Sequence, residues 1–84
     1  MSKDACFMRQ GMIDELDTVN KYRKMMLECE SPECKKLFAS IIEEEMVHVG
    51  EFQFMLEHIC TMSADKIIAG KEEARELIIE NPFS

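Results

Sequence analysis

Glu45 and His48 occupy positions where the surrounding sequence predicts apolar residues. Residues 41–52 read IIEEEMVHVGEF, and steps of three and four residues connect this pair to an apolar series on either side. Residues at this spacing lie side by side on one helix face. The series is Cys34, Phe38, Ile41, Glu45, His48, Phe52, Met55 and Ile59. A carboxylate within an apolar stripe is costly unless a cation, a proton or a hydrogen bond compensates it. The pair therefore predicts a polar site.

Glu15 is the expected partner of this pair. Ser31 followed by Pro32 is typical of an N-cap and a first helical residue, so a second helix is predicted to begin there, after a turn that connects it to the first. Glu15 lies 16 residues before Ser31, and Glu45 and His48 lie 14 and 17 residues after it. In an antiparallel helix pair, equal counts from the turn mean equal heights, because each residue rises about 1.5 Å. Two carboxylates and one imidazole are therefore expected at one level.

These three side chains amount to half of a di-iron site. Di-iron carboxylate bundles use one Glu from each of two helices and a Glu-x-x-His from each of the other two. A two-fold dimer of this chain would supply four carboxylates and two imidazoles, and the four charges would neutralise two divalent irons. We predict that Glu15, Glu45 and His48 are the metal ligands and catalytic residues of such a shared site. Zinc, manganese or calcium could occupy the same ligands.

Three helices are expected to position these residues, at about 4–29, 32–60 and 64–80, in a single all-α domain over residues 1–84. The first two form an antiparallel hairpin, and dimerisation completes a four-helix bundle. Gly11 is expected to loosen the first turns, and Ser63 to cap the third helix. The first helix repeats apolar residues at Met8, Met12, Leu16, Val19, Tyr22 and Met26. A chain of 84 residues is near the lower limit for burying its own core, so a partner or a metal is expected.

The composition excludes several classes of partner. Ten basic and 17 acidic residues give a net charge of −7, which disfavours nucleic acid and anionic membranes and attracts cations. No apolar stretch approaches the roughly 18 residues of a membrane span. The first ten residues are charged and predict no secretion signal, so we expect a cytoplasmic protein. The 4 cysteines form no CxxC pair and are interpreted as reduced packing residues rather than an electron-relay centre.

The segments DELDTVNKY (14–22) and EEEMVH (43–48) resemble the encapsulated ferritins, small two-helix relatives of ferritin and rubrerythrin. The resemblance covers about residues 12–60. It implies a ferritin-like fold whose ferroxidase centre forms between subunits, in ring-shaped homo-oligomers inside an encapsulin shell. It also implies that Glu15, Glu45 and His48 are iron ligands. Two departures are Lys21, which replaces an aromatic residue, and a tail, IIENPFS, without an obvious shell-targeting extension.

The same resemblance implies roles for three neighbouring residues. Asp14 and Asp17 match acidic residues that help iron to enter the centre, and Tyr22 matches a residue just outside the ligands. Asp14 and Asp17 are also readily interpreted as solubilising charges, and Tyr22 as a core aromatic. Glu44 and Glu51 remain open as extra ligands, because both lie within one turn of His48.

The predicted function is oxidation of Fe²⁺ by dioxygen or peroxide at this inter-subunit site, for iron storage or detoxification. One alternative is a rubrerythrin-like di-iron protein that reduces peroxide. The other is a metal-free helical dimerisation module, in which Glu45 and His48 are solvated. Its core face would be rotated toward Leu37, Ile42, Val49 and Leu56.

Overall fold

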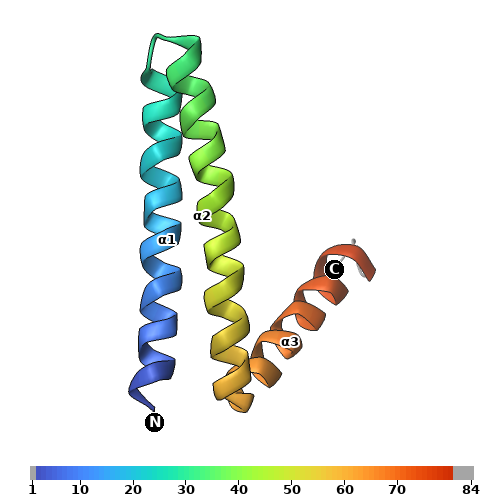
Figure 1. Cartoon of the computed structure of the whole chain (residues 1–84). Helices are drawn as coiled ribbons and strands as arrows, with labels where there is room; N and C mark the ends of the chain where they lie inside the picture. Colours follow the sequence, from blue (N-terminus) through green and yellow to red (C-terminus); the bar gives the residue numbers. More distant parts are fainter. Residues whose placement is uncertain (1, 81–84) are drawn as a thin grey trace.

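Two long antiparallel helices form the body of the protein. The computed structural model describes residues 2–80, and in it α1 (Lys3–Glu28) and α2 (Pro32–Ile59) lie side by side from a short turn onwards (Figure 1). A third helix, α3 (Thr61–Arg75), follows α2 and continues into a π-helical segment, η1 (Glu76–Glu80). The predicted all-α hairpin with a third helix is confirmed.

Side chains on both sides fix the turn between α1 and α2. The backbone N–H of Cys34 donates to the Ser31 hydroxyl over 3.4 Å, which is the predicted N-cap. Lys35 Nζ donates across the turn to the carbonyl oxygens of Met26 at 3.1 Å and Leu27 at 3.5 Å. These carbonyls end α1, where the helix dipole favours a cation. The register of the hairpin is therefore anchored at this end.

Farther from the turn, Phe52 of α2 packs directly against Gly11 of α1. Gly11 lies 20 residues before Ser31 and Phe52 lies 21 after it, so their contact agrees with the equal-height rule. The expectation that Gly11 loosens the helix is wrong, because α1 continues through it without a break. The residue has a packing role instead: a Cβ there would lie 2.7 Å from the Phe52 ring.

The third helix begins earlier than predicted. It starts at Thr61, and Ser63 does not cap it, so the predicted start at Ala64 with a Ser63 cap is wrong. A single extended residue, Cys60, separates α2 from α3, which leaves no linker before Ser63. The Ser63 hydroxyl instead donates to Cys60 Sγ at 3.1 Å.

The surface of α2 that packs on α1 is rotated from the predicted stripe. Val49 and Leu56 are 8% and 4% exposed, whereas Met55 and Ile59 from the predicted stripe are 42% and 40% exposed. Two adjacent rows on one helix share the same steps of three and four, so spacing alone does not tell which row meets the partner helix. Glu45 lies between these two rows, so it belongs to the packed face whichever row is assigned to it. The alternative core face was correct at Val49 and Leu56 and wrong at Leu37, which is 62% exposed.

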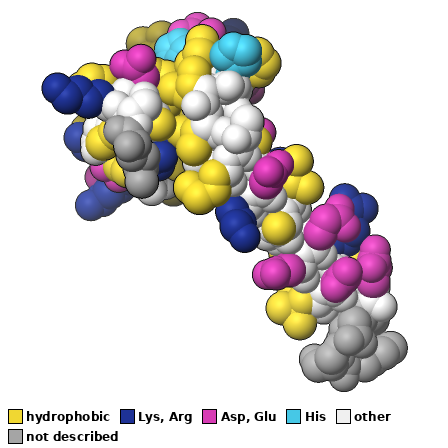
Figure 2. All heavy atoms as spheres, turned by 90° about the horizontal axis from the view of Figure 1, so that it is seen from below, with side chains coloured by type: hydrophobic (Ala, Val, Ile, Leu, Met, Phe, Trp, Pro, Cys, Tyr) yellow, Lys and Arg dark blue, Asp and Glu magenta, His cyan; other side chains and the backbone are white. Residues whose placement is uncertain are grey.

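Much of the described surface is apolar. Only Ala5, Val49 and Leu56 are buried hydrophobic residues within residues 2–80, and no residue of α3 is buried. Figure 1 shows α3 leading away from the hairpin, and Figure 2 shows this arm carrying both hydrophobic and acidic side chains. Bare apolar surface of this extent is typical of a subunit rather than a monomer. No helix in residues 2–80 has the length and hydropathy needed to cross a membrane.

Candidate metal centre

Glu15, Glu45 and His48 meet midway along the hairpin. His48 Nδ1 lies 3.6 Å from Glu15 Oε2 and 3.6 Å from Glu45 Oε2. One ligand atom from each of the three residues lies within 4.8 Å of the others. A separation of 3.6 Å is too long for a good hydrogen bond. Two ligands at about 2.1 Å from one ion can lie up to about 4 Å apart, so both separations leave room for a shared ion.

The Glu15 carboxylate has an unsatisfied oxygen. Its Oε2 atom is buried and has no hydrogen-bond partner, although the whole side chain is 21% exposed. The Glu45 side chain is 19% exposed, so two largely covered carboxylates lie close together. Such an arrangement is unfavourable without a compensating cation. Two carboxylates and an imidazole suit iron, manganese and zinc, so these residues fit a divalent transition metal.

A hollow of about 390 Å³ lies beside this group. It is lined by Glu15, His48, Glu51 and Phe52. His48 has 46% of its side chain exposed, so the imidazole faces the open side of the group. Glu51, which the sequence left open as an extra ligand, belongs to this lining, whereas Glu44 is exposed and does not.

The other predicted site residues lie outside the hollow. Asp14 and Asp17 flank Glu15 on α1 and are both exposed. The Asp14 carboxylate accepts a hydrogen bond from Gln10 Nε2 over 2.8 Å. Tyr22 packs its ring on Phe38 with centroids 5.6 Å apart, about 10 Å beyond Glu15 along the helix. Within one chain, the structure does not bring Tyr22 to the group of Glu15, Glu45 and His48.

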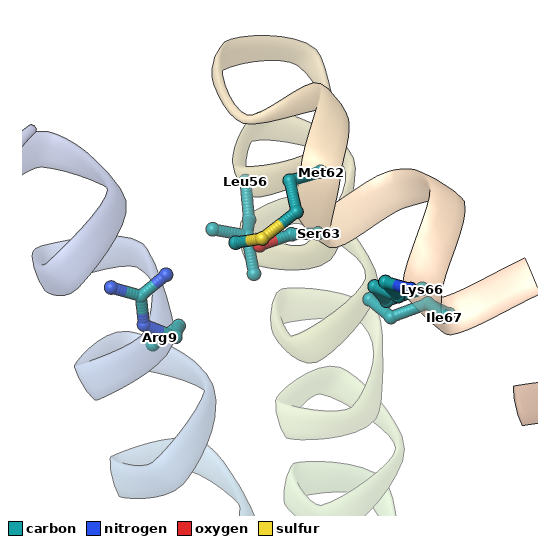
Figure 3. A pocket seen from close by; sticks show the side chains of 6 residues that line it. All are labelled: Arg9, Leu56, Met62, Ser63, Lys66 and Ile67. Carbon is teal, nitrogen blue, oxygen red and sulfur yellow. The ribbon is translucent and has the colours of Figure 1, made fainter. Parts of the chain in front are cut away.

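A second hollow, of about 360 Å³, lies where the three helices meet. In Figure 3, Arg9 approaches from α1, while Leu56 of α2 and the first turns of α3 form the other walls. Beside it, the Ser63 hydroxyl lowers the pKa of the Cys60 thiol, and the charge of Arg9 contributes less. The cysteine spacing predicted only a packing role for Cys60 and gave no signal for this hydrogen bond. The hollow is lined by Arg9, Leu56, Met62, Ser63, Lys66 and Ile67.

Comparison with curated proteins finds a significant similarity. The chain is 33% identical over 70 residues to a ferritin-like-encapsulin shell fusion protein of Pyrococcus furiosus. The matched region is 83% of this chain but 20% of the fusion protein, so the chain spans about a fifth of that relative's length. No family model matches the chain, and no solved structure matches it significantly.

Proposed function

The chain belongs to the encapsulated ferritin-like family, and from this premise we propose that it oxidises Fe²⁺ at a metal centre shared by two copies of the chain. The observation that carries the proposal is the group of Glu15, Glu45 and His48, in which Glu15 Oε2 is buried without a partner. A bound cation would compensate that oxygen, and the three donors match the half-site of a di-iron carboxylate bundle.

Two chains are needed because one chain offers too few ligands for two ions. A two-fold pair would provide four carboxylates and two imidazoles, and its four negative charges would balance two Fe²⁺ ions. Bare apolar residues beside the group support this pairing. His48, Met55 and Ile59 share one face of α2 and are 46%, 42% and 40% exposed. A second chain covering this face would bury apolar surface and add its own ligands.

Fe²⁺ is the substrate in this proposal. With dioxygen, two Fe²⁺ ions and two protons yield two Fe³⁺ ions and one hydrogen peroxide; with peroxide as oxidant, the other product is water. The protein holds the two ions close together through Glu15 and Glu45, and the imidazole of His48 supplies a nitrogen donor. The relative's name combines a ferritin-like protein with an encapsulin shell. We therefore propose that this chain works with such a shell in the cytoplasm and supplies oxidised iron for storage or detoxification.

Asp14 and Asp17 are proposed to concentrate cations near the centre. Both are exposed and flank Glu15, and long-range attraction by exposed carboxylates is weakened by salt. The double variant Asp14→Asn with Asp17→Asn should therefore slow iron uptake more at low than at high ionic strength. A slowing that does not depend on salt would argue against this role.

Stopped-flow absorbance after mixing Fe²⁺ with aerobic protein tests the main proposal. Glu15→Ala, Glu45→Ala and His48→Ala should each abolish rapid oxidation. Glu43→Ala is the matched control, because Glu43 is an exposed carboxylate on α2 outside the metal-ligand group. Wild-type rates in all three ligand variants would refute the assignment. Repeating the measurement with hydrogen peroxide under anaerobic conditions distinguishes dioxygen from peroxide as the preferred oxidant.

A further inference from the structure

Glu51 brings another carboxylate of this chain to the hollow beside the proposed metal centre. It lines the hollow with Glu15, His48 and Phe52, and it is exposed enough to change rotamer freely. It follows His48 by three residues, which places it about 4.5 Å farther along the same face of α2. A carboxylate on this side chain can therefore approach an ion that His48 holds.

Glu51 has no cation to neutralise it within the described residues. No hydrogen bond or ion pair of its carboxylate occurs in residues 2–80. Residues 37–59 contain neither lysine nor arginine. In a two-fold pair, Glu51 would raise the number of carboxylates from four to six, which is two more negative charges than two divalent ions require.

We propose that Glu51 is a further metal-binding carboxylate, which compensates the charge that the bound iron gains on oxidation. This inference rests on the proposed function. In a two-fold pair, Glu15 and Glu45 of both chains supply four negative charges, which balance two Fe²⁺ ions. Oxidation to two Fe³⁺ ions adds two positive charges, and the two copies of Glu51 supply two more negative charges. The oxidised centre is then electrically balanced.

The surroundings strengthen this effect. Phe52, adjacent in sequence, forms an apolar wall of the same hollow. Charges interact more strongly beside apolar groups than in open water. Because Coulomb energy is proportional to the charge of the ion, a Glu51 carboxylate favours a trivalent over a divalent ion. Glu51 is thus expected to set the preference of the site for the oxidised metal.

Isothermal titration calorimetry of the full chain with Co²⁺ and with Tb³⁺ tests the proposal without turnover. Co²⁺ represents the divalent state and Tb³⁺ a trivalent state. Glu51→Gln should weaken Co²⁺ binding by about tenfold and Tb³⁺ binding by about thirtyfold, since the logarithm of the loss scales with ion charge. Glu44→Gln is the matched control, because Glu44 is an exposed carboxylate on α2 outside the hollow. It should change both affinities by less than about threefold, as expected for a screened surface charge.

The possible results separate this inference from the proposed function. Equal losses of Co²⁺ and Tb³⁺ affinity in Glu51→Gln would overturn charge compensation. The same conclusion would follow if Glu51→Gln and Glu44→Gln bound Tb³⁺ with equal affinity. Glu45→Ala provides the reference for the main centre. If the wild type binds Co²⁺ and Glu45→Ala does not, a failed Glu51 prediction leaves the proposed function standing. If the wild type binds neither ion, both proposals fall.

Discussion

Gly11 of α1 and Phe52 of α2 lie in direct contact, so that a Cβ on Gly11 would be 2.7 Å from the aromatic ring. The same ring lines the hollow beside Glu15 and His48. The absence of a side chain at Gly11 therefore allows the two helices to approach closely about one turn from Glu15 and His48. Because this contact sets how closely α1 and α2 approach, it also affects the distance between Glu15 on α1 and His48 on α2.

Gly11→Ala should destabilise the protein despite the better helix propensity of alanine. The propensity gain is about 0.5–1 kcal/mol, whereas forcing a methyl group into a filled space costs about 1–3 kcal/mol. We expect a net loss of about 1 kcal/mol in the free energy of unfolding, measured by urea denaturation and circular dichroism. Gly70→Ala is the control, because a Cβ there meets nothing within 4 Å, and it should be stabilising. Equal stabilisation by both substitutions would show that the Phe52 ring moves aside freely.

Glu15→Gln should stabilise the metal-free protein and weaken metal binding. The substitution removes one of two neighbouring charges, and the amide keeps the shape of the side chain at the buried Oε2 position. Relief of this unfavourable burial is expected to raise the free energy of unfolding by about 1 kcal/mol in the presence of a chelator. Thermal unfolding with EDTA and with Co²⁺ measures both effects. Glu43→Gln, at an exposed position, should change neither; a destabilised metal-free Glu15→Gln would contradict the interpretation.

Divalent metal should promote association of the chain. Within residues 2–80, each chain brings together Glu15, Glu45 and His48 as possible ligands, and one such group is too small to hold two ions. An ion that binds the paired form better than separated chains shifts the equilibrium toward pairs. Sedimentation velocity at one protein concentration should show dimers or multiples of dimers increasing on addition of Co²⁺, and His48→Ala should reduce that response. A metal-saturated chain that stays monomeric would show that the centre is not shared.

Ser63→Ala should make the Cys60 thiol less reactive toward iodoacetamide near neutral pH. The Ser63 hydroxyl donates to Cys60 Sγ over 3.1 Å and is the main cause of the lowered pKa of the thiol. Without that hydrogen bond the pKa should rise, and a smaller fraction of the reactive thiolate should remain. Alkylation of the peptide containing Cys60, followed by mass spectrometry across pH, tests this. Ser40→Ala is the control; an unchanged pH profile in Ser63→Ala would exclude the hydrogen bond as the cause.

The heights of Glu15, Glu45 and His48 along the hairpin follow from local rules. Ser31 and Pro32 specify where the second long helix begins, and the constant rise of a helix then converts residue counts into positions along the hairpin. Residue counts from Ser31 therefore suffice to place Glu15 level with Glu45 and His48. The contact of Gly11 with Phe52 follows the same rule, at 20 and 21 residues from Ser31.

Rotation about the helix axes depended on the tertiary structure. Val49 and Leu56 face α1, while Met55 and Ile59 remain bare, although both rows have helical spacing. Local spacing assigns residues to adjacent faces, but the packing of the two helices determines which face is covered. Gly11 likewise permits helix breaking or close packing, and only the nearby Phe52 ring distinguishes these roles. Height along the helix decides between Glu44 and Glu51, which are seven residues apart and lie on nearly the same face of α2. Only Glu51 lines the hollow, because the hollow lies on the Phe52 side of His48.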